Sequence, residues 1–233
     1  MTTTGSASEV LRDECRTIWT SLHEHPFITE LAEGTLPLDR FRFFLEQDDF
    51  YLEEYARCLA LGAAKSRTER ELRYFTVDLN QVLEAELPSN RELLARVIEL
   101  GTEDHGGARM PAPANLAYTS YMQALSMRGG PLEIMAALLP CSWSYVDIAT
   151  TLRERTASDH PVYSDWIGYF SRPEVVDMVA EMRRDFDELV LEEATTGARR
   201  QAVAEIFAMS CRLERAFWEM AYTLDQWPDV RGS

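Results

Sequence analysis

The feature that most restricts the fold is the spacing of apolar residues, which recur every three or four positions over long stretches. Between Leu38 and Ser66, for example, Phe41, Phe44 and Leu45 start a series that continues along one helical face. Alternation of apolar and polar residues, the pattern of strands, is scarce. Because each predicted helix carries a single apolar stripe, it must share a core with the others. We therefore expect an all-α fold, a single-domain helical bundle.

Prolines, glycines and asparagines divide this pattern into helices. The expected helices are Leu38–Ser66, Thr68–Ala85, Arg91–Gly101, Asn115–Met127, Pro131–Thr156, Val162–Tyr169, Pro173–Thr195 and Ala198–Leu224. A break is expected at Pro88–Asn90, and the clearest loop contains Gly106 and Gly107. Since no Pro/Ser-rich linker or repeat divides the chain, we expect a disordered lead over residues 1–8, one domain over 9–228 and a tail over 229–233.

Composition and charge exclude several classes of partner. The 233 residues include 39 acidic and 23 basic ones, a formal net charge of −16, without a compensating basic cluster. Such a surface repels phosphate backbones and anionic lipid, so we expect no nucleic-acid partner. No run reaches the roughly 18 apolar residues of a membrane span, and the first residues lack the features of a secretory signal.

The cysteines and histidines indicate the compartment and the cofactor requirement. Four scattered cysteines without a CxxC motif predict reduced thiols and a cytoplasmic protein. The four histidines have no spaced carboxylate partners, so a haem or di-iron centre is hard to build and no cofactor is expected.

Two acidic residues fall on apolar helical faces. Asp48 lies four residues after Phe44 and three before Tyr51, and Glu214 lies three before Phe217. A buried carboxylate without partners costs several kcal/mol, so each acid is either paired with a neighbouring helix or part of a site. Aromatic surroundings would raise the pKa of Glu214 and suit it to proton transfer near neutral pH.

Cys141 is the third polar candidate, in a helix that also contains Pro140. A proline inside a helix leaves backbone groups free near the cysteine, although a cysteine on an apolar face is more often a core residue than a nucleophile. Four tyrosines are further candidates, because a buried tyrosine hydroxyl needs a hydrogen-bond partner. Several such residues around one pocket would suit a planar heteroaromatic ligand, which the rings can stack on and the hydroxyls can orient. These tyrosines are Tyr51, Tyr118, Tyr145 and Tyr163.

Together these residues lie in five segments that resemble the TenA/thiaminase II family, which has the haem-oxygenase-like helical fold. The segments occur in the family's order and cover the chain from about Phe41 to Trp227. They are Phe41–Leu52, Ala117–Met122, Leu138–Tyr145, His160–Ile167 and Glu214–Tyr222.

The resemblance implies a role for each candidate residue. Cys141 would be the nucleophile that adds to a pyrimidine ring, and Glu214 the acid/base at a ring nitrogen, with Tyr163 nearby. Asp48 would bind the exocyclic amine and the adjacent ring nitrogen. Tyr51, Tyr118 and Tyr145 would stack on or orient the ring.

The implied reaction is hydrolysis of 4-amino-5-aminomethyl-2-methylpyrimidine to the hydroxymethyl compound and ammonia, a step of thiamine salvage. Thiamine would be a further substrate, and the family resemblance suggests a homotetramer. A pyrimidine- or thiamine-binding protein without turnover is the alternative, although a binder needs no thiol. A related enzyme with a drifted substrate also stays open, because Leu213 and the loop 103–113 depart from the family's usual pattern.

Overall fold

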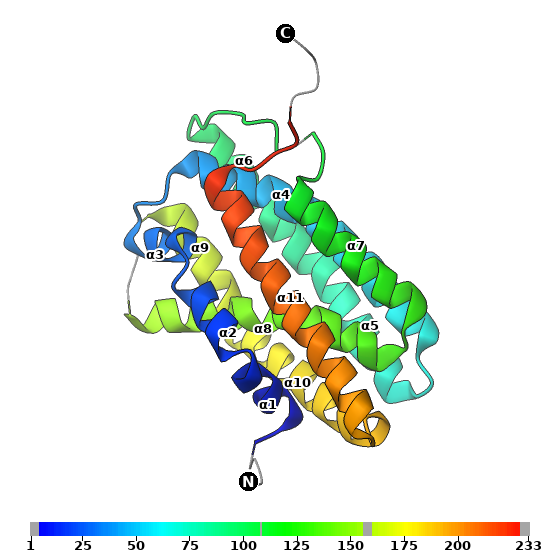
Figure 1. Ribbon diagram of the computed structural model, residues 1–233. Coiled ribbons are helices and arrows are strands. Elements are labelled where there is room, and N and C mark those ends of the chain that lie inside the picture. Colours follow the sequence, from blue (N-terminus) through cyan, green and yellow to red (C-terminus); the bar gives the residue numbers. More distant parts are fainter. Residues whose placement is uncertain (1–4, 108, 156–159, 229–233) are drawn as a thin grey trace.

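The computed structural model describes residues 5–107, 109–155 and 160–228, and all of its regular structure is helical. Eleven α-helices and one π-helical turn, η1, follow one another along the described parts of the chain (Figure 1). They are α1 (Ala7–Glu14), α2 (Arg16–His23), α3 (Pro26–Glu33), α4 (Leu38–Lys65), α5 (Glu69–Gln81), η1 (Val82–Glu86), α6 (Leu87–Glu99), α7 (Pro113–Arg128), α8 (Pro131–Arg155), α9 (Pro161–Phe170), α10 (Pro173–Glu193) and α11 (Gly197–Thr223). The expected all-α fold is confirmed.

Local sequence signals explain many of the helix ends. Proline occupies the first turn of α3, α7, α9 and α10, where its missing N–H is not needed. Thr68 and Thr196 cap α5 and α11 by accepting a hydrogen bond from the backbone three residues on. Gly34 ends α3 with a φ of 74°, a left-handed conformation that costs glycine little.

The long helices α4, α7, α8 and α11 form the framework around the candidate residues. In Figure 1, α11 runs along the length of the molecule beside α7, and α8 crosses behind them. The buried apolar residues of these helices belong to one continuous cluster, in which Phe44 stacks on Trp218 with ring centroids 5.1 Å apart. One shared core means that the described helices fold as one unit.

Three expectations about the chain need correction. Ser6 caps α1 and the backbone N–H of Ser8 donates to Asp187, so the lead expected over 1–8 is wrong for these residues. Residues 1–4 and the tail 229–233 lie outside the described residues, as does Thr156, the expected end of α8. Pro88 does not break the chain: the helix continues through η1 into α6, where Pro88 lies in the first turn.

The third correction concerns α8. By length and composition, the segment Pro131–Glu154 is long and apolar enough to cross a membrane, so the expectation that no run reaches this length is wrong. Inside the molecule 78% of the apolar window is buried. This helix therefore fills the centre of the bundle, and Pro140 lies within it without ending it.

Candidate active site

A cavity of about 220 Å³ opens between α4, α6 and α9, and Asp48 lines it. The Asp48 side chain comes from the inward face of α4 and is 6% exposed. Among the residues that the structure describes, none forms a hydrogen bond or an ion pair with this carboxylate. Burial, followed by the nearby Glu86 and Glu214 charges, raises the pKa of Asp48 well above its usual value. An unpartnered buried acid in a cavity wall is suited to a ligand that supplies N–H donors.

Cys141 lies at a second, much smaller space of about 20 Å³, lined also by Tyr51, Tyr145 and Ser142. The cysteine is half-buried on α8 directly after Pro140. Burial first, and then the neighbouring Glu214 charge, raise the pKa of the Cys141 thiol well above its usual value, while a hydrogen bond with Tyr51 opposes them. The resting thiol is therefore protonated at neutral pH and needs a base to become a nucleophile.

Glu214 is in position to be that base. It comes from α11, is 2% exposed and lies close enough to the Cys141 thiol for each group to shift the pKa of the other. The Tyr118 hydroxyl donates to Glu214 Oε1 at 2.5 Å. Burial raises the pKa of Glu214 to about 7, against the lowering effect of the hydrogen bonds from Tyr118 and Cys141. A carboxyl group with this pKa exchanges protons readily near neutral pH.

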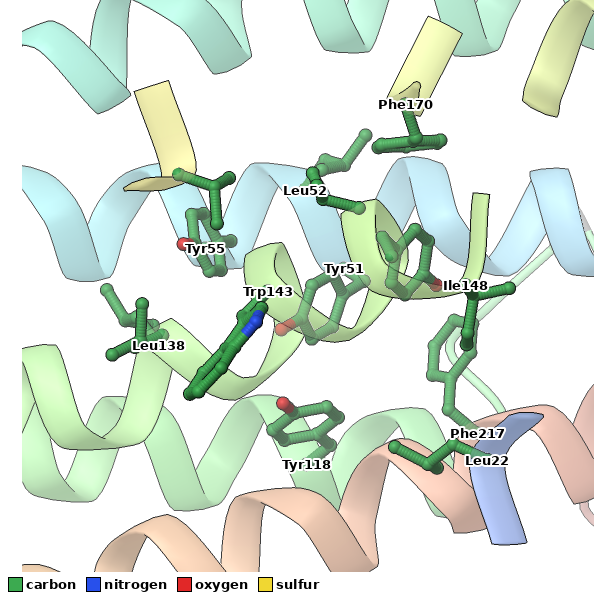
Figure 2. Packing of buried hydrophobic residues seen from close by; sticks show 14 of the residues in the cluster. Leu22, Tyr51, Leu52, Tyr55, Tyr118, Leu138, Trp143, Ile148, Phe170 and Phe217 are labelled. Carbon is green, nitrogen blue, oxygen red and sulfur yellow. The ribbon is translucent and has the colours of Figure 1, made fainter. Parts of the chain in front are cut away.

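Three of the predicted tyrosines surround these groups. Tyr51 and Tyr118 have ring centroids 5.0 Å apart, and Figure 2 shows their hydroxyl ends turned toward each other from α4 and α7. The ring of Tyr145 stacks on Trp218 at 5.1 Å and meets Phe170 edge-on at 5.0 Å. These rings form apolar walls of the kind that bind a planar ligand.

Tyr163, the fourth predicted tyrosine, lies elsewhere. Its hydroxyl donates to the Leu36 carbonyl at 2.6 Å, and its ring packs against His160 and Phe41 at 4.2 and 5.0 Å. It lines neither the cavity nor the Cys141 pocket. The structure thus places Tyr163 in the core between α4 and α9, apart from Cys141, Asp48 and Glu214. Tyr169, six residues further along α9, lines the cavity instead.

Sequence reasoning also missed Glu86, which lines both the cavity and the Cys141 pocket. The signal was present: Glu86 lies four residues after the buried Val82 and eight after the buried Asp78, on the same helical face. It was overlooked because Pro88 placed the expected helix end at Ala85. The π-turn and the proline in the first turn of α6 allow the helix to continue past that point.

A hydrogen-bonded chain supports the floor of the Cys141 pocket. Tyr55 donates to Asp78 at 3.2 Å, and its oxygen lies 2.9 Å from the hydroxyl oxygen of Ser142. Burial raises the pKa of Asp78 to about 7, and the hydrogen bond from Tyr55 opposes that rise. Within the described residues, no group of three or more His, Cys, Asp or Glu side chains is arranged to hold a metal ion.

The arrangement therefore combines a thiol, a proton-exchanging carboxyl group and an acidic cavity wall. The thiol of Cys141 can attack an electron-poor ring while Glu214 takes its proton. Asp48 can accept hydrogen bonds from amino groups of a bound ring. These roles are hypotheses that the contacts favour.

Comparison with known proteins identifies the family. The TENA/THI-4/PQQC family model matches residues 12–224. An aminopyrimidine aminohydrolase of Halalkalibacterium halodurans is 35% identical over 219 residues, which cover 93% of this chain and 96% of the relative.

Solved structures agree with this relationship. A TenA family transcription regulator from Silicibacter sp. TM1040 gives a TM-score of 0.84 at 25% identity, covering 94% of this chain and 97% of that chain. A domain from Shewanella denitrificans with a haem-oxygenase-like fold gives a TM-score of 0.69 at 15% identity, covering 95% of this chain and 94% of that chain. This similarity confirms the expected fold. Because both the family model and a relative 35% identical span nearly its whole length, this chain belongs to the TENA/THI-4/PQQC family.

Proposed function

We propose that the protein is an aminopyrimidine aminohydrolase, which converts 4-amino-5-aminomethyl-2-methylpyrimidine and water into the 5-hydroxymethyl compound and ammonia. The observation that carries this proposal is the closeness of the Cys141 thiol to the buried Glu214 carboxyl group, which Tyr118 holds through a hydrogen bond, and to the unpartnered Asp48. A protein that only bound a pyrimidine would need the acid and the tyrosines but not this thiol–carboxyl pair. The name of the relative from Halalkalibacterium halodurans agrees with the proposed activity.

The proposed reaction begins at Cys141. Its sulfur forms a bond to an electron-poor ring carbon, its proton passes to Glu214, and a ring nitrogen is protonated as the ring loses aromaticity. The bond between the exocyclic carbon and the amine then breaks, and the amine leaves as ammonia. Water adds to that carbon, and the ring regains aromaticity when the carbon–sulfur bond breaks and the thiol is restored.

The surrounding residues position the ring for these steps. Asp48 accepts hydrogen bonds from the 4-amino group and pairs with the adjacent ring nitrogen, as the raised pKa of its carboxyl group permits. Tyr118 holds the Glu214 carboxyl group in place through its 2.5 Å hydrogen bond. Tyr51 and Tyr145 supply aromatic walls. Thiamine, in which the amine is replaced by a thiazolium leaving group, is a second substrate to be tested.

We further propose that the protein is a homo-oligomer, a tetramer by family resemblance, in the cytoplasm. Helix α7 supports self-association because it has no charged residue before Arg128 in a strongly acidic chain, and it exposes Leu116 and Met127. The four free cysteines fit a reducing compartment. Light scattering coupled to size-exclusion chromatography measures the mass directly, and a monomer would contradict the oligomer.

The test of the activity is ammonia release from purified protein with the aminomethyl pyrimidine, and with thiamine in parallel. Replacing the nucleophile in Cys141→Ala should lower the rate by at least ~10³-fold, and Glu214→Gln by roughly 10²- to 10⁴-fold. Cys58→Ala, at a buried cysteine of α4, and Glu205→Gln, at an exposed acid of α11, are matched controls that should keep near wild-type rates. Tight pyrimidine binding without turnover by the wild-type protein would indicate a binding protein instead.

A further inference from the structure

Glu86 occupies a special place in the backbone. It is the last residue of the π-turn η1, in which the backbone N–H of Leu87 bonds to the Val82 carbonyl five residues earlier. Such turns insert one extra residue into a helix and occur often at functional sites. Here the turn joins α5 to α6 without a break, so Glu86 projects from a continuous helix and not from a loop.

The side chain of Glu86 lies where two spaces meet. Of the described residues, only Glu86 and Phe170 line both the 220 Å³ cavity that contains Asp48 and the 20 Å³ pocket that contains Cys141. A space of 20 Å³ holds about one water molecule, so the larger cavity must receive most of a bound pyrimidine. The Glu86 side chain therefore borders both the cavity that can hold a ring and the pocket that contains the thiol.

The Glu86 carboxylate has no direct partner. No hydrogen bond or ion pair links it to another described residue, whereas the nearby Asp78 receives a hydrogen bond from Tyr55. Burial first, and then the Asp78 charge, raise the pKa of Glu86 to about 8, although Arg172 at the start of α10 opposes both effects. A cation or a strong N–H donor that binds beside such an acid would stabilise its ionised form, and this interaction would favour binding of the ligand.

The substrate proposed above and its product differ in one such group. The aminomethyl arm of the substrate is a primary amine and is largely cationic near neutral pH, like a lysine side chain. The hydroxymethyl arm of the product is neutral, while the ring and its 4-amino group are the same in both compounds. Asp48 therefore recognises what the two compounds share, and a second acid is needed to recognise the part that changes.

We infer that Glu86 is a specificity-determining residue that binds the cationic aminomethyl arm, so that the site prefers the substrate amine over the neutral hydroxymethyl product. The inference rests on the proposed aminopyrimidine substrate. Phe170, the other residue common to both spaces, provides an apolar wall beside Glu86. Once ammonia has left, the arm no longer pairs with Glu86, and this loss favours product release.

The experiment measures equilibrium binding by calorimetry in the Cys141→Ala background, in which the ligand is not consumed. Adding Glu86→Gln should weaken binding of the aminomethyl pyrimidine by roughly tenfold or more, because a charge-assisted hydrogen bond is lost. Binding of the hydroxymethyl compound should change by less than about threefold. Glu84→Gln, at an exposed acid of the same turn that lines neither space, is the matched control and should alter neither affinity appreciably.

Two further measurements distinguish a binding role of Glu86 from a folding defect in Glu86→Gln. Glu86→Asp retains the charge on a shorter side chain and should give an intermediate preference, which a folding defect would not produce. In the background with an intact thiol, Glu86→Gln should raise KM for the amine more than it lowers kcat.

Equal weakening of both ligands by Glu86→Gln, or no weakening of the amine, would overturn the inference. Its failure is distinct from failure of the proposed activity, which is judged by ammonia release from the wild-type protein. A chain that binds the amine selectively through Glu86 but releases no ammonia would keep the inference and disprove the hydrolase.

Discussion

Two neighbouring residues of α4, Gln47 and Asp48, hold contrasting positions. Gln47 is 1% exposed and fully paired: its amide donates to the Gly107 carbonyl at 2.9 Å, and its oxygen accepts from the backbone N–H of Ala112 at 2.8 Å. Its oxygen also accepts from the side chain of Asn115 at 3.0 Å. Asp48, one residue later and nearly as buried, has no partner among the described residues.

We interpret this difference as that between a polar residue that stabilises the fold and one that is available to bind a ligand. The Gln47 hydrogen bonds fix the loop between α6 and α7 to α4, so they stabilise the fold. The unpaired Asp48 destabilises the empty protein and stabilises only a complex with a ligand that donates to it. Burial alone, which the two residues share, does not distinguish these roles, whereas the state of the hydrogen bonds does.

The largest expected effect is on activity, from Asp48→Asn. An amide cannot form the carboxyl group's paired hydrogen bonds to the 4-amino group and the ring nitrogen, so kcat/KM should fall roughly 10³-fold, or about 4 kcal/mol. The free energy of unfolding at pH 8 should stay the same or rise by about 1 kcal/mol, because a buried ionisable group without a partner is removed. Steady-state kinetics and urea denaturation measure the two quantities. A large loss of stability would show that Asp48 has a structural partner and would remove the contrast with Gln47.

The opposite pattern is expected for Gln47→Leu. Leucine leaves the Gly107 carbonyl and the Ala112 N–H without partners, so the free energy of unfolding should fall by about 3 kcal/mol. The folded fraction should retain kcat/KM within roughly fivefold, since Gln47 lines neither space. Gln201→Leu removes an exposed glutamine bonded only to Glu205 and should change stability by less than about 0.5 kcal/mol. Loss of activity without loss of stability would assign Gln47 to the site.

Glu214 resembles Gln47 in having a hydrogen-bond partner and Asp48 in having a raised pKa. Its contribution to the free energy of unfolding therefore depends on pH. Its pKa is raised to about 7 in the folded protein, so between pH 4.5 and 7 the unfolded chain ionises first and stability falls as pH rises. Relative to Glu214→Gln, the wild-type protein should therefore lose about 3 kcal/mol of stability across this window and little more above it. Denaturation of both proteins at a series of pH values measures this difference, and a constant difference would contradict the raised pKa.

The pKa of Glu214 also determines how the rate should depend on pH. In the proposed mechanism Glu214 takes the Cys141 proton and must be ionised to do so, and kcat/KM should therefore rise with pH through an inflection near 7. In Tyr118→Phe the carboxylate loses the hydrogen bond that lowers its pKa, so the inflection should move to higher pH. An inflection that stays in place in this variant would assign it to another group.

Much of this site was predictable from sequence because Asp48, Cys141 and Glu214 each interrupt an apolar helical face. Gln47 was not, since three consecutive residues of α4 at 46–48 are buried and periodicity cannot rank them. The position of Glu86 depended on whether a helix could continue past Pro88, and the π-turn that allows it has no clear sequence signal. The bundle itself was predictable because the long helices have regular stripes and capping residues.

The two tyrosines of α9 provide the smallest expected effect and show why a local pattern could not choose between them. Both are aromatic residues on a short helix, but the Tyr163 hydroxyl bonds to the Leu36 carbonyl, while Tyr169 lines the cavity and accepts from the Gln81 amide at 3.2 Å. Tyr163→Phe should therefore lower the free energy of unfolding by about 1 kcal/mol and leave kcat/KM within roughly twofold.

Tyr169→Phe should do the reverse, with stability changed by less than about 0.5 kcal/mol and KM raised roughly threefold through the altered cavity wall. Thermal denaturation and steady-state kinetics on the pair measure both effects. A KM effect at Tyr163 equal to that at Tyr169 would mean that the site extends behind α9 toward Leu36. In that case a fully paired hydroxyl would affect binding, and the rule drawn from Gln47 and Asp48 would not extend beyond α4.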